Sequence, residues 1–84
     1  MKDLIEYLVK NIVNHPDDVE ITESKSETSD GKNSITYTIK VNPEELGLVI
    51  GKGGQTIRSI RNLVRLKAIK HSTYVDIKLA EEQL

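Results

Sequence analysis

The sequence feature that most restricts the fold is a glycine turn at residues 51–54, Gly-Lys-Gly-Gly, which holds three of the five glycines in the chain. An apolar run ends at Ile50, directly before the turn, and apolar residues resume at Ile57. Glycine is favoured where a backbone bends sharply or where another group must approach it closely. We therefore predict that one helix ends at this turn and that a second helix runs from about residue 55 to residue 69.

The second of these helices is basic. Between Val49 and Val75 there is no Asp or Glu, and the basic residues are Lys52, Arg58, Arg61, Arg65, Lys67 and Lys70. Backbone N–H groups in a glycine turn, the positive end of a helix dipole and a row of positive side chains all favour an anion. The ligand that this combination predicts is a chain of phosphate groups.

The same helix has an apolar stripe and two leucines outside it. The stripe consists of Ile57, Ile60, Val64 and Ala68, and the flank beside it carries Arg58, Arg61 and Arg65. Leu63 and Leu66 fall outside the stripe when the helix turns by about 100° per residue. Either the helix is buried on more than one side, or these two leucines form a contact surface for a homodimer or a partner helix.

The net charge of −1 conceals an uneven distribution. Residues 1–48 contain five lysines and ten acidic residues, whereas residues 49–84 contain seven basic residues and three acidic ones. A molecule polarised in this way can bind a polyanion on one face. The alternative is that these are ordinary solvated charges.

Local signals predict two further helix boundaries. An amphipathic helix is expected from Lys2 to Asn14, and it should end before Pro16 because a residue that precedes proline disfavours the helical conformation. A short helix of about two turns should start with Asn42 as its N-cap and Pro43 at its first position, with Glu45 completing a capping box.

Alternating apolar residues predict three strands, at about residues 19–24, 35–41 and 75–79. Asp30-Gly31 is typical of a hairpin turn, so the first two strands should pair antiparallel. Tyr37, in the second strand, is expected in the core with its hydroxyl at the rim.

The predicted element order is α-β-β-α-α-β. Two helices separate the second and third strands, so these strands should run parallel through a right-handed crossover. The fold class is therefore α+β, with a three-stranded mixed sheet packed against three helices. A chain of this length provides for one core, and we assign residues 1–84 to a single domain with its core at about 2–80 and a C-terminal tail at 81–84.

The glycine turn and its flanks resemble a known signature. Residues 49–57, Val-Ile-Gly-Lys-Gly-Gly-Gln-Thr-Ile, are similar to the Ile-Gly-x-x-Gly signature of KH domains, which bind single-stranded RNA and DNA. Residues 51–54 correspond to the GxxG loop of these domains. The element order resembles the type II, prokaryotic KH fold over essentially the whole chain. Within that fold, the sequence looks most like the KhpA family of bacterial proteins, which consist of a lone KH domain.

This resemblance implies a function, a location and partners. KhpA-type proteins are bacterial and cytoplasmic, and they act as broad-specificity RNA binders, RNA chaperones or post-transcriptional regulators. They form homodimers, pair with a larger KH protein of the Jag type, and in some bacteria influence cell shape through elongation and division. The resemblance therefore implies single-stranded RNA as the ligand, with a homodimer and a Jag-type protein as expected assemblies.

The predicted RNA-binding site combines the loop, an apolar groove and two arginines. The loop glycines permit the bend and remove Cβ atoms that would hold phosphates away from the backbone N–H groups. The groove and the edge of the third strand would receive the bases. The predicted RNA-binding residues are Gly51, Lys52, Gly53, Gly54, Val49, Ile50, Ile57, Arg58 and Arg61. A KH domain clamps about four nucleotides, so we expect weak binding by one copy and a gain from dimerisation.

Composition argues against several other functions. The chain has no Cys and therefore no disulfide or thiolate site, and no apolar run approaches the roughly 18 residues of a membrane span. Residues 47–53 lack the spacing of a Walker A loop, so we expect no enzymatic activity and no cofactor. Two alternatives stay open: a KH-fold adaptor or dimerisation module that acts through protein partners, and a binder of single-stranded DNA.

Overall fold

The computed structural model describes residues 1–27, 29, 31 and 33–80. Its helices and strands, in chain order, are α1 (Lys2–Lys10), β1 (Glu20–Glu27), β2 (Asn33–Lys40), α2 (Leu46–Ile50), α3 (Gln55–Lys70) and β3 (Tyr74–Leu79). Short 3₁₀ turns occupy Pro16–Asp18, Pro43–Glu45 and Lys52–Gly54. The predicted order α-β-β-α-α-β is confirmed. Asp30 of the predicted hairpin turn and the predicted tail at 81–84 lie outside the described residues.

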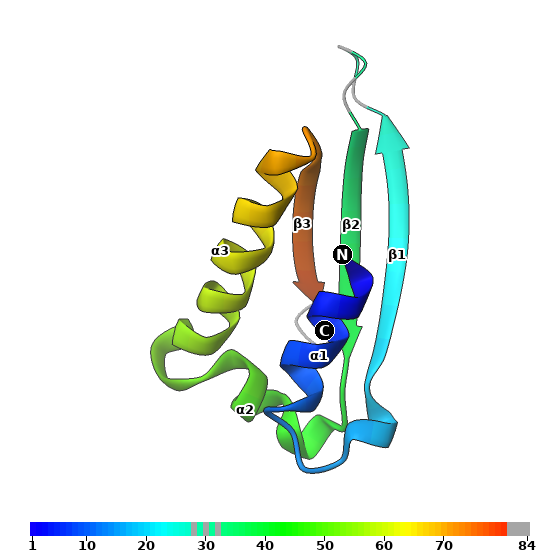
Figure 1. Ribbon diagram of the computed structural model, residues 1–84. Coiled ribbons are helices and arrows are strands. Elements are labelled where there is room, and N and C mark those ends of the chain that lie inside the picture. The colour runs from blue at the N-terminus through cyan, green and yellow to red at the C-terminus, as the bar shows by residue number, and fades with distance from the viewer. Residues whose placement is uncertain (28, 30, 32, 81–84) are drawn as a thin grey trace.

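The three strands form one sheet in the order β1-β2-β3 (Figure 1). β1 pairs antiparallel with β2, with Ile21 opposite Ile39. β2 pairs parallel with β3, with Ile35 opposite Val75. Both predicted pairings are confirmed, and β3 forms one edge of the sheet.

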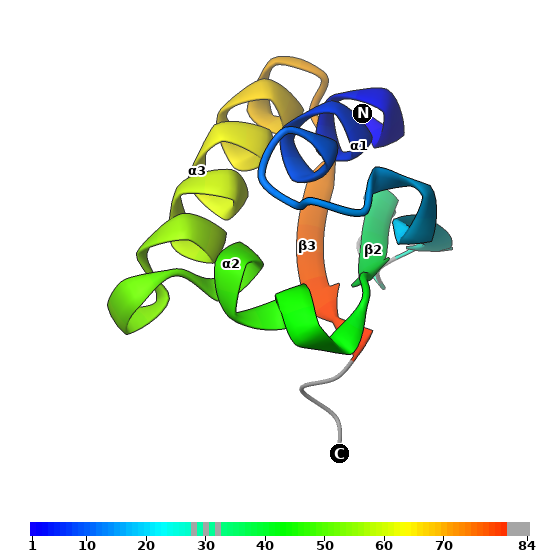
Figure 2. The ribbon, with the colours of Figure 1, turned by 90° about the horizontal axis from the view of Figure 1, so that it is seen from below.

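Helices α1 and α3 lie on the same face of the sheet, and α2 lies beside the start of α3 (Figures 1 and 2). The core fills the space between this helical layer and the sheet, and α3 contributes the predicted stripe Ile57, Ile60, Val64 and Ala68 to it. Tyr37 is buried, as predicted, and its burial and then the charge of Glu23 raise the pKa of its hydroxyl. In β3, alternate residues are buried against the helices and the others face away.

α1 ends at Lys10, one turn earlier than predicted. The prediction extended it to Asn14, but the backbone N–H groups of Asn14 and His15 donate to the carboxylate of Glu45, with a distance of 3.0 Å for His15. These N–H groups are therefore not available to continue the helix. The helix has already tightened at Ile12, whose N–H donates to the C=O of Val9 at 3.0 Å, and Glu45, 30 residues away along the chain, then takes up the donors of Asn14 and His15.

The start of the α2 region is partly as predicted. Asn42 is the N-cap, and its Oδ1 accepts a hydrogen bond of 3.0 Å from the N–H of Glu44. The predicted capping box is wrong, because Glu45 is 4% exposed and turns its carboxylate toward Asn14 and His15 instead. Burial acts to raise the pKa of Glu45, but the two backbone hydrogen bonds and the contact with His15 together hold that pKa below its ordinary value.

Candidate nucleic-acid interface

The glycine loop begins with a backbone bend at Gly51. Its N–H donates to the C=O of Gly47 at 2.9 Å and closes α2, while its φ of 76° and ψ of 171° turn the chain out of the helix. A Cβ atom at this position would lie 2.2 Å from Oγ1 and 2.8 Å from the backbone nitrogen of Thr56. Since other residues rarely adopt this conformation and none would fit here, the position requires glycine.

Gly53 and Gly54 form the tip of the loop and also have positive φ angles, of 64° and 77°. A Cβ atom on Gly53 would meet nothing within 4 Å, so the loop presents open space at this residue. The N–H of Gly54 donates to the C=O of Gly51 at 3.1 Å. Among the hydrogen bonds of the described residues, none uses the N–H of Lys52 or of Gly53. The tip therefore has backbone donors that a ligand can reach.

Arg58 lies one turn into α3 and reaches back to the loop. Its Nη2 donates to the C=O of Gly53 at 2.9 Å. The side chain of Lys52 is exposed at the same tip. Two positive groups thus lie beside the open backbone donors, which is an arrangement that favours a phosphate.

The other two arginines of the predicted flank reach the edge of β3. Arg61 is half-buried, and its Nε donates to the C=O of Ile77 at 3.1 Å. Nη2 of Arg65 lies 3.8 Å from Oδ1 of Asp76, and that oxygen also accepts a 2.9 Å hydrogen bond from the N–H of Ile77. The flank therefore runs from the glycine loop along α3 to the free edge of the sheet.

The predicted apolar groove is mostly part of the core. Val49 and Ile57 are buried, and Ile50 is half-buried and packs against the core cluster. Because Val49 and Ile57 have almost no exposed surface, they support the loop from beneath. Of these three residues, Ile50 has the largest surface to offer a base.

Leu63 and Leu66 are 47% and 64% exposed. The alternative in which α3 is buried on more than one side is therefore wrong. The two side chains lie on the solvent face of α3, where they are available for contact with another molecule.

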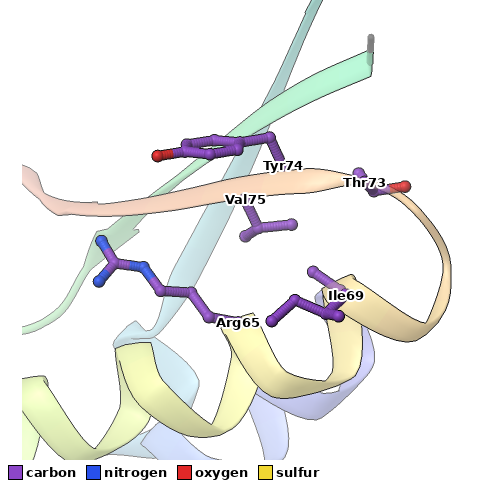
Figure 3. Close-up of a pocket in the computed structure, with 6 residues that line it drawn as sticks. Arg65, Ile69, Thr73, Tyr74 and Val75 are labelled. Atoms are coloured by element: carbon purple, nitrogen blue, oxygen red, sulfur yellow. The ribbon is translucent and has the colours of Figure 1, made fainter.

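Sequence reasoning missed a group of residues at the other end of α3. Arg65, Ile69 and Tyr74 help to line a cavity of about 260 Å³ between the last turns of α3 and the start of β3 (Figure 3). Sequence reasoning placed Arg65 on the flank with Arg58 and Arg61 but did not count it among the binding residues. Tyr74 could have been found as an aromatic residue on the outward-facing side of the alternation in β3.

Metal binding and membrane spanning find no support in the described residues. Within them, no group of three His, Asp or Glu side chains is arranged to hold a metal ion. None of the helices in the described ranges has the length and apolar content needed to cross a bilayer.

A GxxG loop between a short helix and a longer basic helix, on a mixed three-stranded sheet in α-β-β-α-α-β order, defines the type II KH class. The protein-family model described as "KhpA/KhpB, KH domain" matches residues 2–79. The chain belongs to this KhpA/KhpB KH-domain family.

Two relatives agree with this assignment, and a solved structure shares the fold. The RNA-binding protein KhpA of Clostridium perfringens is 38% identical over 79 residues, which are 94% of this chain and 99% of that protein. The protein of the same name from Listeria monocytogenes is 37% identical over 81 residues, 96% of this chain and 100% of that protein. A crystal structure of an Aquifex aeolicus Era variant bound to GDP.AlF4- superposes with a TM-score of 0.67 at 15% identity. It covers 92% of this chain and 28% of the Era chain, and it supports the fold alone.

Proposed function

We propose that this protein binds single-stranded RNA and that the phosphate backbone passes over the GxxG loop, residues 51–54. The observation that carries the proposal is the open loop tip. There the N–H groups of Lys52 and Gly53 make no hydrogen bond within the described residues, and two positive side chains lie beside them. Relatives of nearly the same length are named RNA-binding proteins, which supports RNA as the polyanion. Neither their names nor the family description denotes a catalysed reaction.

In this proposal the loop, and not the apolar residues, provides most of the affinity. Phosphates contact the backbone at Gly53 and Gly54 and the side chains of Lys52 and Arg58, and these contacts carry no sequence information. The bases then lie toward Ile50 and the edge of β3. A site of this kind binds with loose specificity, as a broad-specificity RNA chaperone or post-transcriptional regulator requires. The resemblance to the KhpA family supports such a role, together with a cytoplasmic location, a Jag-type partner and an influence on cell shape.

Comparison of Gly53→Asp with Gly53→Asn tests the loop. Both side chains have nearly the same shape, both tolerate a positive φ, and a Cβ at this position meets nothing within 4 Å. Only the aspartate adds a negative charge in the phosphate path. By fluorescence anisotropy with a short single-stranded RNA, we expect Gly53→Asp to abolish binding and Gly53→Asn to retain most of it, with both variants folded by circular dichroism.

Other outcomes of this titration separate the alternatives. A folded Gly53→Asp protein with unchanged RNA affinity would exclude the loop as the binding site. No binding of RNA or of a DNA of the same sequence by the unmodified protein would favour the adaptor module. Equal binding of both nucleic acids would leave RNA and single-stranded DNA as equivalent ligands.

We also infer that the exposed leucines of α3 contribute to a homodimer. Leu63 and Leu66 are large apolar side chains on a solvent face, where single copies of a small RNA-binding domain would gain from a second binding site. We expect Leu66→Asp to shift a dimer to a monomer in light scattering. Tyr7→Asp, at an exposed position on α1, is the control and should leave the mass unchanged. If the unmodified protein, Leu66→Asp and Tyr7→Asp all have the same mass, Leu63 and Leu66 do not form a dimer interface.

A further inference from the structure

The two edges of the sheet differ in how their backbone groups are satisfied. At the β3 edge, the N–H of Ile77 donates to Oδ1 of Asp76 at 2.9 Å, and its C=O accepts from Nε of Arg61 at 3.1 Å. Side chains of the protein therefore satisfy both backbone groups of Ile77. At the β1 edge, no hydrogen bond within the described residues reaches the backbone of Glu20–Glu27 from outside the sheet.

β1 is a long and regular edge strand. It pairs with β2 without a bulge, from Glu20 opposite Lys40 to Glu27 opposite Asn33. Figure 1 shows β1 as the outermost strand, on the side of the sheet away from α3. An edge of this kind presents a row of unpaired N–H and C=O groups, which can pair with a further strand.

The charges on β1 restrict which strand can pair with it. Glu23 and Lys25 lie on the helical face of the sheet, because Glu23 is opposite the buried Tyr37. Nζ of Lys25 lies 3.5 Å from Oε1 of Glu23. Opposite charges directly across a strand pair are stabilising, and like charges are destabilising. β1 therefore suits a strand that carries the same two charges in the reverse order, as an antiparallel copy of β1 does.

We propose that the β1 edge binds the β1 edge of a second copy of this chain, in an antiparallel pair centred on Ser24. In this register, Glu23 of each copy lies opposite Lys25 of the other copy, so the two ion pairs join into a group of four alternating charges. On the other face of the sheet, Thr22 lies opposite Ser26, and hydroxyl pairs of this kind are also favourable. The two sheets become one continuous sheet.

Other registers of this pair are less favourable. A closed pair of identical edges has a two-fold axis, and the axis must pass through a residue because residues opposite each other share a face. An axis at Glu23 places Glu23 opposite itself, and an axis at Lys25 places Lys25 opposite itself. An axis at Ser26 pairs opposite charges but overlaps only residues 25–27 of β1. Charge and overlap therefore select the same register, centred on Ser24.

This contact is separate from the exposed leucines of α3. Leu63 and Leu66 lie on α3, which is beside β3, and β1 is at the opposite edge of the sheet (Figure 1). One molecule can therefore use both surfaces at once, which joins its copies into a chain. Such a chain would present several glycine loops to one RNA and raise the overall affinity without a new RNA contact.

Disulfide trapping tests the register directly. The chain has no Cys, so Ser24→Cys introduces a single thiol. In the proposed pair, the two Cα atoms of residue 24 are about 4.5–5.5 Å apart, which a disulfide can span. Ser26→Cys is the control, because it is also exposed on the same face of β1 but its two copies would be about 14 Å apart. Both changes are made in Leu66→Asp, so that the leucine contact does not contribute.

We expect mild oxidation without RNA to give a covalent dimer with Ser24→Cys and little with Ser26→Cys, as measured on a non-reducing gel. Cross-linking at residue 26 as strong as at residue 24 would overturn the proposal, because it would indicate random collision or another register. Absence of cross-linking at both residues would also overturn it.

Charge exchange provides the second measurement. Added to Ser24→Cys, Glu23→Lys places like charges opposite each other at both pairs, so the cross-linking rate should fall by roughly tenfold. The double exchange of Glu23→Lys with Lys25→Glu restores opposite charges, and the rate should recover, with all variants folded by circular dichroism. A double variant that stays as slow as Glu23→Lys would overturn the proposal. Neither measurement involves RNA, so this result and that of the RNA titration are independent.

Discussion

The two ends of the α2 region are built in opposite ways. At the start, side chains take up backbone donors: Asn42 accepts from the N–H of Glu44, and Glu45 accepts from the N–H groups of Asn14 and His15. At the end, three of the four residues 51–54 are glycines, and the N–H groups of Lys52 and Gly53 make no hydrogen bond within the described residues. One end is closed by side chains, and the other is open.

This contrast separates residues that hold the fold from residues that are kept for a ligand. The buried carboxylate of Glu45 ties the segment after α1 to the start of α2 and faces no open surface. The glycine loop leaves polar backbone groups unsatisfied, which has a cost in a protein unless water or a ligand binds them. Changes at the closed end should therefore affect stability, and changes at the open loop tip should affect binding.

Gly51→Ala is the change with the largest expected effect, because within the loop Gly51 is needed for the fold itself. An added Cβ would lie 2.2 Å from Oγ1 of Thr56, at a φ of 76°. Steric overlap and backbone strain should together lower the free energy of unfolding by about 2–5 kcal/mol, measured by urea denaturation. Gly53→Ala is the control, because its Cβ meets open space and only the strain of a positive φ remains, about 1–2 kcal/mol. Equal losses for the two variants would contradict this division of the loop.

The element order, the strand pairings and the α3 core stripe were predictable from the sequence. They depend on the periodicity of apolar residues and on local signals such as Asn42 and Pro43. Glu45 shows where such reasoning fails. Its spacing from Asn42 fits a capping box, but its carboxylate instead accepts hydrogen bonds from the backbone N–H groups of residues 14 and 15. Local spacing cannot reveal a contact between segments so far apart in the chain. The same contact takes up the N–H groups of Asn14 and His15, which a helix as long as predicted would have used.

The candidate site was predictable only where it depends on local sequence spacing. Glycine spacing and arginine spacing are local, so the loop and the flank of α3 could be located. The cavity that Arg65, Ile69 and Tyr74 help to line is formed where the end of α3 meets the start of β3, and it is open because β3 is an edge strand. Val49 and Ile57 were assigned to a groove because both are apolar and close to the loop, but only packing shows that they point into the core.

Glu45→Gln tests the closed end, and its expected effect is smaller. The variant keeps the size of the side chain but removes the charge that the N–H groups of Asn14 and His15 stabilise. We expect a lower Tm at neutral pH and unchanged RNA affinity. Glu44→Gln removes the same charge from the adjacent exposed position and should leave Tm nearly unchanged. A loss of RNA affinity with an unchanged Tm would reverse the roles assigned to the two ends.

The effect of Glu45→Gln on Tm should depend on pH. The pKa of Glu45 is lower in the folded protein than its ordinary value of 4.5, so the ionised carboxylate stabilises the fold at pH values above 4.5. This contribution is lost as the pH falls through the lowered pKa. The difference in Tm between the unmodified protein and Glu45→Gln should therefore be largest near neutral pH and shrink below pH 4.5. A difference that grew toward low pH would contradict the assignment.

Lys52→Ala should have the smallest effect. It tests whether the side chain at the open loop tip contacts a phosphate. Its exposed side chain has no role in the core, so the Tm should not change. If its ammonium group contacts one phosphate, the slope of log affinity against log salt should become shallower by about one unit. Lys67→Ala removes the same charge from the side of α3 that faces Met1 and Tyr37, and its slope should equal that of the unmodified protein. Equal slopes for all three proteins would mean that Lys52 contacts no phosphate, and the backbone donors with Arg58 would then account for the anion affinity of the loop.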